Sequence, residues 1–120
     1  MNDSILLIYK SVTGFTKRYA QWIAEETGCT LSEYHKRMAE QMAPYDTVIF
    51  ASRAHAGRID GLPDIRRQFQ QSGARRLILC VTGAMPGTAG DIIDDFWKQN
   101  LTEEEQKAIP HFYMPGGLCY

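Results

Sequence analysis

The stretch that decides the fold lies near the N-terminus and reads Ile5-Leu6-Leu7-Ile8-Tyr9-Lys10-Ser11-Val12-Thr13-Gly14-Phe15-Thr16. Its first five residues form a continuous apolar run, which is typical of a buried strand. A hydroxyl-rich turn follows, and amphipathic helical periodicity begins at Thr16. Such a turn presents backbone N–H groups at the positive end of a helix dipole, and it therefore favours an anion. The sequence predicts either a phosphate-binding turn or a plain strand-to-helix connection.

Outward from this stretch, short apolar runs alternate with amphipathic segments along the chain. We expect strands over residues 5–9, 29–34, 47–51, 77–81 and 111–114, and helices over 16–27, 36–42, 62–72, 89–99 and 102–109. The helix over 89–99 is expected to bury Ile92, Ile93 and Phe96. This alternation predicts an α/β fold with a parallel sheet and helices on both faces. Ligands of such sheets bind outside the carboxyl ends of the strands, here at the expected loops 11–16, 52–58 and 82–87.

The totals describe one ordinary globular domain spanning residues 1–120, with 44% hydrophobic and 22% charged residues. A formal net charge of −1 argues against nucleic-acid binding. The apolar runs are too short for a membrane span, and the N-terminus lacks the pattern of a secretory signal, so we expect a cytoplasmic protein. The 3 cysteines predict neither a disulfide framework nor a metal site, and Cys80 is expected to be a small buried residue.

Two familiar phosphate motifs are absent from the sequence. It has no GxxxxGK[ST] loop, and no GxGxxG follows the first apolar run. The run from Leu7 to Ile23 instead resembles the FMN signature of flavodoxins, with its Ser/Thr-x-Thr-Gly-x-Thr turn between strand and helix. Pro44-Tyr45-Asp46 ahead of Val48-Ile49-Phe50 resembles the entry to the third strand of that family. The resemblance implies a doubly wound, five-stranded parallel sheet in the order 2-1-3-4-5.

The resemblance also implies a set of FMN contacts. The phosphate turn would comprise Ser11, Val12, Thr13, Gly14, Phe15 and Thr16. The flavin ring would be bordered by two loops, comprising Ser52, Arg53, Ala54, His55, Ala56 and Gly57, and Thr82, Gly83, Ala84 and Met85. Phe15 replaces the usual Asn of the turn, and neither ring loop carries a Trp or Tyr. His55 is the candidate for giving or taking a proton beside the ring.

Three functions follow as hypotheses. The first is an FMN-binding electron-transfer protein whose partner is a redox protein or a small molecule such as a quinone. The second is an FMN oxidoreductase, because residues 111–120 resemble the flavodoxin-domain proteins related to protoporphyrinogen oxidase. The third is an interaction module without cofactor. Flavodoxins generally end with a helix over the sheet, and the sequence lacks it, so the resemblance implies a truncated form or a covering surface, for example in a homodimer.

Overall fold

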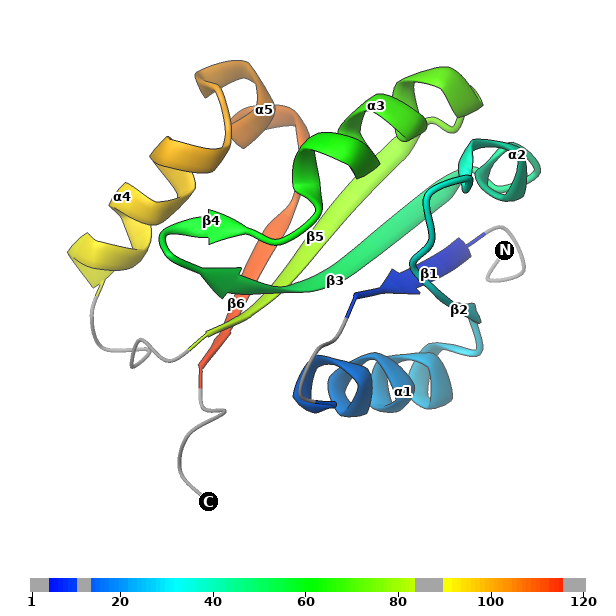
Figure 1. The fold of residues 1–120 in the computed structure, drawn as a ribbon, viewed down its shortest axis with the longest axis horizontal. Coiled ribbons are helices and arrows are strands. Elements are labelled where there is room, and N and C mark those ends of the chain that lie inside the picture. Colours follow the sequence, from blue (N-terminus) through cyan, green and yellow to red (C-terminus); the bar gives the residue numbers. More distant parts are fainter. Residues whose placement is uncertain (1–4, 11–13, 84–89, 116–120) are drawn as a thin grey trace.

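The structure is a computed structural model, and it describes residues 5–10, 14–83 and 90–115. Its elements, drawn in Figure 1, are β1 (Ile5–Tyr9), α1 (Phe15–Thr27), β2 (Thr30–Glu33), α2 (Ala39–Met42), β3 (Thr47–His55), β4 (Arg58–Ile59), α3 (Leu62–Ser72), β5 (Arg76–Gly83), α4 (Gly90–Asn100), α5 (Glu103–Ala108) and β6 (His111–Pro115).

The sheet has the predicted order. Its parallel strands run β2-β1-β3-β5-β6, which is 2-1-3-4-5 when only the parallel strands are numbered. Tyr9 stands opposite Ala51, and Ala51 stands opposite Cys80, so the carboxyl ends of the central strands lie side by side. α1 lies on one side of the sheet, and α2 to α5 lie on the other (Figure 1). The doubly wound α/β class is therefore confirmed.

The two sides of the sheet form separate apolar clusters, because alternate side chains of a strand point to opposite faces. The larger cluster lies under α2 to α5 and has Phe50 and Leu79 among its fully buried members. The smaller cluster lies under α1 and includes Leu7, Ala20 and Cys80. Burial on both faces explains why the central strands read as continuous apolar runs. Burial also raises the pKa of the Cys80 thiol to about 11, which keeps this residue a small neutral side chain.

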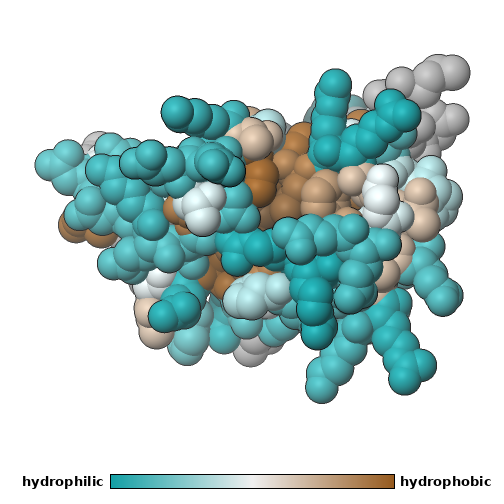
Figure 2. Space-filling view, turned by 90° about the horizontal axis from the view of Figure 1, so that it is seen from above, coloured by the Kyte–Doolittle hydropathy of each residue, from teal (hydrophilic) through white to brown (hydrophobic). Residues whose placement is uncertain are grey.

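The side of the molecule covered by α2 to α5 has a largely polar surface (Figure 2). Figure 2 looks onto this side, where hydrophilic side chains cover the helices and hydrophobic residues show in the gap between them. One prediction for this layer is wrong: Ile92 is 58% exposed, whereas Phe96 and Trp97 are buried. α4 therefore turns its 96–97 edge to the sheet, and the indole of Trp97 packs on the His111 ring at 4.6 Å between centroids.

The segment expected as a loop over 52–58 is a β-hairpin, so that prediction is wrong. β3 continues to His55, and β4 returns antiparallel to it, with Ala54 opposite Ile59 and His55 opposite Arg58. The two turn residues, Ala56 and Gly57, have φ values of 52° and 80°. Positive φ at both central positions matches the right-handed twist of the paired strands, which is why two-residue hairpins use it. A non-glycine residue at the first of these positions disguises the turn in the sequence.

Candidate functional site

A chain of hydroxyl contacts joins the first turn of α1 to the carboxyl ends of β5 and β3. The Thr16 hydroxyl lies 2.8 Å from the Thr82 hydroxyl, although the two residues are 66 positions apart. The Thr82 hydroxyl in turn donates to the Ser52 carbonyl at 3.4 Å. All three residues are buried. One residue from each of the three predicted ligand segments is thus brought together at the same edge of the sheet.

The start of α1 supplies the groups that an anion needs. Gly14 is in the left-handed region with φ 88°, and a Cβ added there would meet nothing within 4 Å. The Arg18 N–H donates to the Gly14 carbonyl at 3.1 Å, so the N–H groups of residues 15–17 lie ahead of the helical ladder. The first turn carries no acidic residue. The other phosphate-turn residues, Ser11, Val12 and Thr13, and the side chain of Phe15, lie outside the described part.

We predict that Thr16 would contact an anion through its backbone N–H more than through its hydroxyl. The hydroxyl already faces Thr82, and the residue is 3% exposed. Thr16→Val is expected to lower the free energy of unfolding by about 1 to 2 kcal/mol, because it leaves the buried Thr82 hydroxyl poorly partnered. Thr27→Val, on the exposed end of the same helix, is the matched control and should cost under about 0.5 kcal/mol. Urea denaturation measures the free energy of unfolding of both variants. Equal losses would show that the contact between the Thr16 and Thr82 hydroxyls does not stabilise the fold.

A charged cluster stands beside this edge. The Lys10 ammonium lies 3.0 Å, and Arg53 Nε 3.5 Å, from the same carboxylate oxygen of Asp60. Burial alone would raise the pKa of Asp60, but the hydrogen bond and charge of Lys10, joined by the charge of Arg53, outweigh it and lower that pKa. Arg53 Nε is buried and makes no hydrogen bond within the described residues. Two cations, from the residue after β1 and from β3, therefore share one anion at the carboxyl edge of the sheet.

The residues predicted to border the flavin ring lie partly in strands and partly in a turn. Ser52 to His55 belong to β3 and Thr82 and Gly83 to β5, while Ala56 and Gly57 form the hairpin tip. His55 is exposed at the end of its strand. The hairpin faces α4 across a groove of about 470 Å³, lined by Ala54, Ala56, Gly57, Ile92, Asp95, Phe96 and Gln99. Ala84 and Met85 lie outside the described part of the chain.

Tyr113 is a residue at this edge that the sequence analysis missed. An alanine at position 83 would place its Cβ 2.6 Å from the Tyr113 hydroxyl oxygen, so the phenol lies directly over Gly83. Gly83 is accordingly needed for the close approach of an aromatic ring from β6. The signal was present in the order of the strands, because β6 pairs with β5 and sets Val81 opposite Tyr113.

Tyr34 follows β2 and is tied to the helix layer. Its hydroxyl donates to the Asp64 carboxylate. Burial and then this hydrogen bond raise the pKa of Tyr34 to about 12. A raised pKa means that the neutral phenol contributes stability below pH 10, which is lost as pH rises toward 12.

We expect one tyrosine to ionise near pH 12 when the apoprotein is titrated by ultraviolet absorbance, and Tyr34→Phe should remove that step. Asp64→Asn should move the step toward the ordinary pKa of about 10, because the negative acceptor is gone. If the step lost in Tyr34→Phe lay near pH 10 and Asp64→Asn left the titration curve unchanged, this contact would not hold the phenol neutral.

The fold and the candidate site define a class of protein. It is the class of α/β proteins with a doubly wound parallel sheet, which bind ligands outside the carboxyl ends of the strands. Within that class, the family model of the flavodoxin domain matches residues 6–120, and the chain belongs to this family. No protein of curated function matches the chain by sequence.

Solved structures share the fold at low identity. A Trp repressor binding protein from Bacillus subtilis has a TM-score of 0.61 at 14% identity, covering 93% of this chain and 83% of its own. A putative flavoprotein from Bacteroides uniformis has a TM-score of 0.59 at 16% identity, covering 97% and 92%. The rubredoxin oxygen:oxidoreductase from Desulfovibrio gigas has a TM-score of 0.53 at 15% identity, where the match covers 98% of this chain but 32% of that one. The comparisons give no support to the protoporphyrinogen-oxidase branch.

The described residues show neither a metal cluster nor a membrane-spanning helix. Those residues contain no cluster of three His, Cys, Asp or Glu side chains placed to hold a metal ion. None of the helices they form is both long and apolar enough to cross a bilayer.

Proposed function

We propose that this chain binds FMN non-covalently at the carboxyl edge of its sheet and takes part in electron transfer. The observation that carries the proposal is the contact between the first turn of α1 and the ends of β5 and β3, made through Thr16, Thr82 and Ser52. Membership of the flavodoxin domain family supports it. FMN supplies the redox chemistry when bound, and the protein binds it, orients it and controls the access of water.

The residues present fit the phosphate end of FMN. The N–H groups ahead of Arg18 offer donors, Gly14 leaves open space, and the helix dipole favours a negative charge. Phosphate recognition of this kind uses mostly backbone, which agrees with the Thr16 hydroxyl being turned toward Thr82.

The ring end of FMN would border the β3–β4 hairpin and the end of β5. The wall formed by Ala54, Ala56 and Gly57 is made of small residues, which lets a flat ring approach the backbone. Backbone N–H and C=O groups there would hold the polar edge of the ring, and contacts that differ between redox states would shift its potential. The electron partner we propose is a redox protein or a small molecule such as a quinone.

Reconstitution followed by reduction tests the function. The apoprotein is titrated with FMN, the flavin fluorescence is followed, and the complex is then reduced with dithionite and mixed with a one-electron acceptor. We expect one FMN per chain and reoxidation of the bound flavin by the acceptor. Failure to bind added FMN would exclude the proposal and favour an interaction module without cofactor.

A further inference from the structure

The β3–β4 hairpin is short, and only its base is fixed to the sheet, by the buried Ile59 and by the Asp60 N–H, which donates to the Arg53 carbonyl at 3.0 Å. Its ladder consists of two residue pairs, Ala54 with Ile59 and His55 with Arg58. A pairing this short is not stable alone in water. Its turn also keeps a non-glycine residue, Ala56, at φ 52°, a conformation that L-residues rarely adopt. The tip of the hairpin therefore depends on contacts from outside.

Asn100, the last residue of α4, supplies those contacts with a single amide. Its Oδ1 accepts the Ile59 N–H at 2.9 Å, and its Nδ2 donates to the Gly57 carbonyl at 3.0 Å. The same Nδ2 donates to the Phe96 carbonyl of α4 at 2.8 Å. One side chain thus holds the turn and the returning strand of the hairpin against the helix. The task needs a donor and an acceptor on one short side chain, which an amide provides.

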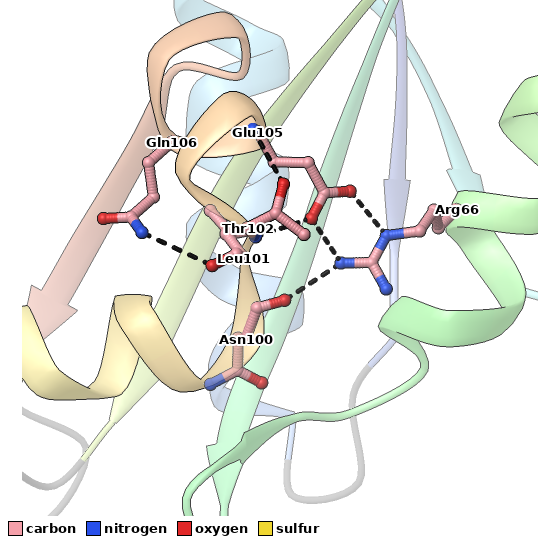
Figure 3. Close-up of polar contacts among 6 residues, drawn as sticks. All are labelled: Arg66, Asn100, Leu101, Thr102, Glu105 and Gln106. Atoms are coloured by element: carbon pink, nitrogen blue, oxygen red, sulfur yellow. Dashed lines mark hydrogen bonds and ion pairs between the residues drawn. The ribbon is translucent and has the colours of Figure 1, made fainter.

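Asn100 is itself held by the neighbouring helices (Figure 3). Its backbone carbonyl accepts a hydrogen bond from Arg66 Nη2 of α3 at 2.9 Å. Arg66 also forms a two-point ion pair with Glu105 of α5, at 2.7 and 3.1 Å. Glu105 closes the capping box with Thr102 at the start of α5. The end of α4 is fixed from two sides, so the amide is aimed at the hairpin.

We propose that Asn100 is a positioning residue for the flavin: through its amide it keeps the hairpin, and with it Ala54, Ala56 and Gly57, in the conformation that borders the ring. This inference rests on the proposed function, because it takes the hairpin to be a ring-binding segment. We call the hydrogen bonds from the Asn100 amide to Ile59 and Gly57 the clamp. Without the clamp the hairpin adopts other conformations, and the apparent affinity for FMN falls in proportion to the fraction of molecules whose hairpin can border the ring. We expect Asn100→Ala and the isosteric Asn100→Asp each to raise the FMN dissociation constant by roughly 5- to 10-fold.

The test combines two readouts. Amide hydrogen exchange of Ile59 in the apoprotein, followed by NMR, reports the hydrogen bond to Asn100 without any cofactor. FMN titration reports its consequence. Gln106→Ala is the matched control, since Gln106 bonds the Leu101 carbonyl at 3.3 Å on the same helix corner without contacting the hairpin. Ala56→Gly, added to Asn100→Ala, relieves the turn and should restore part of the affinity.

The proposal holds if both Asn100 variants speed hairpin exchange and weaken FMN binding, while Gln106→Ala does neither and Ala56→Gly gives partial rescue. It is overturned if exchange at Ile59 stays slow, or if exchange rises and FMN affinity does not change. If the unaltered protein binds no FMN, the proposed function fails and the positioning role fails with it. The exchange data then still report whether the clamp exists, so the two failures are distinguishable.

Discussion

Gly14→Asp is expected to weaken FMN binding by at least about 100-fold, which is about 2.7 kcal/mol. A carboxylate at the N-cap of α1 would take the N–H groups of residues 15–17 for itself and would repel the phosphate. Two unit charges 4 Å apart interact by about 4 kcal/mol at the effective dielectric near a protein surface, so the repulsion alone accounts for the loss. An added Cβ would meet no atom within 4 Å, and Asp tolerates the positive φ of 88° better than most residues, so the fold should survive. Fluorescence titration with FMN measures the effect.

Gly28 offers a matched control at the other end of the same helix. It also has a positive φ, 72°, and open space around an added Cβ. Gly28→Asp therefore introduces the same charge and similar backbone strain away from the proposed phosphate site. FMN affinity should stay within about 2-fold of the unaltered protein in this variant. Equal losses in the two variants would show that the start of α1 does not hold the phosphate.

Phe50→Ala is expected to lower the free energy of unfolding by about 3 to 5 kcal/mol. Phe50 is fully buried in the centre of β3, within the larger apolar cluster, and its ring packs near Tyr34 with 6.2 Å between centroids. It also lies against Gly61, where an added Cβ would come within 3.3 Å of the Phe50 ring. The truncation leaves a cavity between the sheet and α3 that these neighbours cannot fill without moving.

Phe112→Ala makes the same chemical change at an exposed position. Phe112 is 56% exposed on β6, so the loss should be under about 1 kcal/mol. Urea denaturation of the two apoproteins, monitored by circular dichroism, gives the comparison. A loss below about 1 kcal/mol for Phe50→Ala would mean that β3 is not the centre of the core.

The fold could be predicted because its signals are local and repeated. Apolar runs such as 47–51 and 77–81 mark strands buried on both faces, and the Thr102 capping box marks the start of α5. Ile92 shows the limit of periodicity. With Ile93, Phe96 and Trp97 near it, several apolar stripes fit α4, and contact with the sheet and His111 selects the one that leaves Ile92 outside.

The candidate site was predictable only in part, for a related reason. The turn before α1 has a local motif, so residues 11–16 could be assigned as a phosphate turn from the resemblance. The hairpin has none, because Ala56 stands where glycine or asparagine would normally signal a two-residue turn. Asn100 contacts residues 41 to 43 positions away, and single-sequence patterns carry no trace of such a contact. Tyr113 lies over a residue 30 positions away, and the strand order places the two strands side by side without showing which side chains meet.

Calorimetric titration of the apoprotein with FMN and with riboflavin is the most direct test of the central claim. The two ligands share the ring and differ by the phosphate, so their affinity ratio measures what the start of α1 contributes. We expect one FMN per chain and an affinity at least about 100-fold above that for riboflavin, as phosphate contacts worth about 2.7 kcal/mol would give. Equal affinities, or no binding of either ligand, would contradict the account.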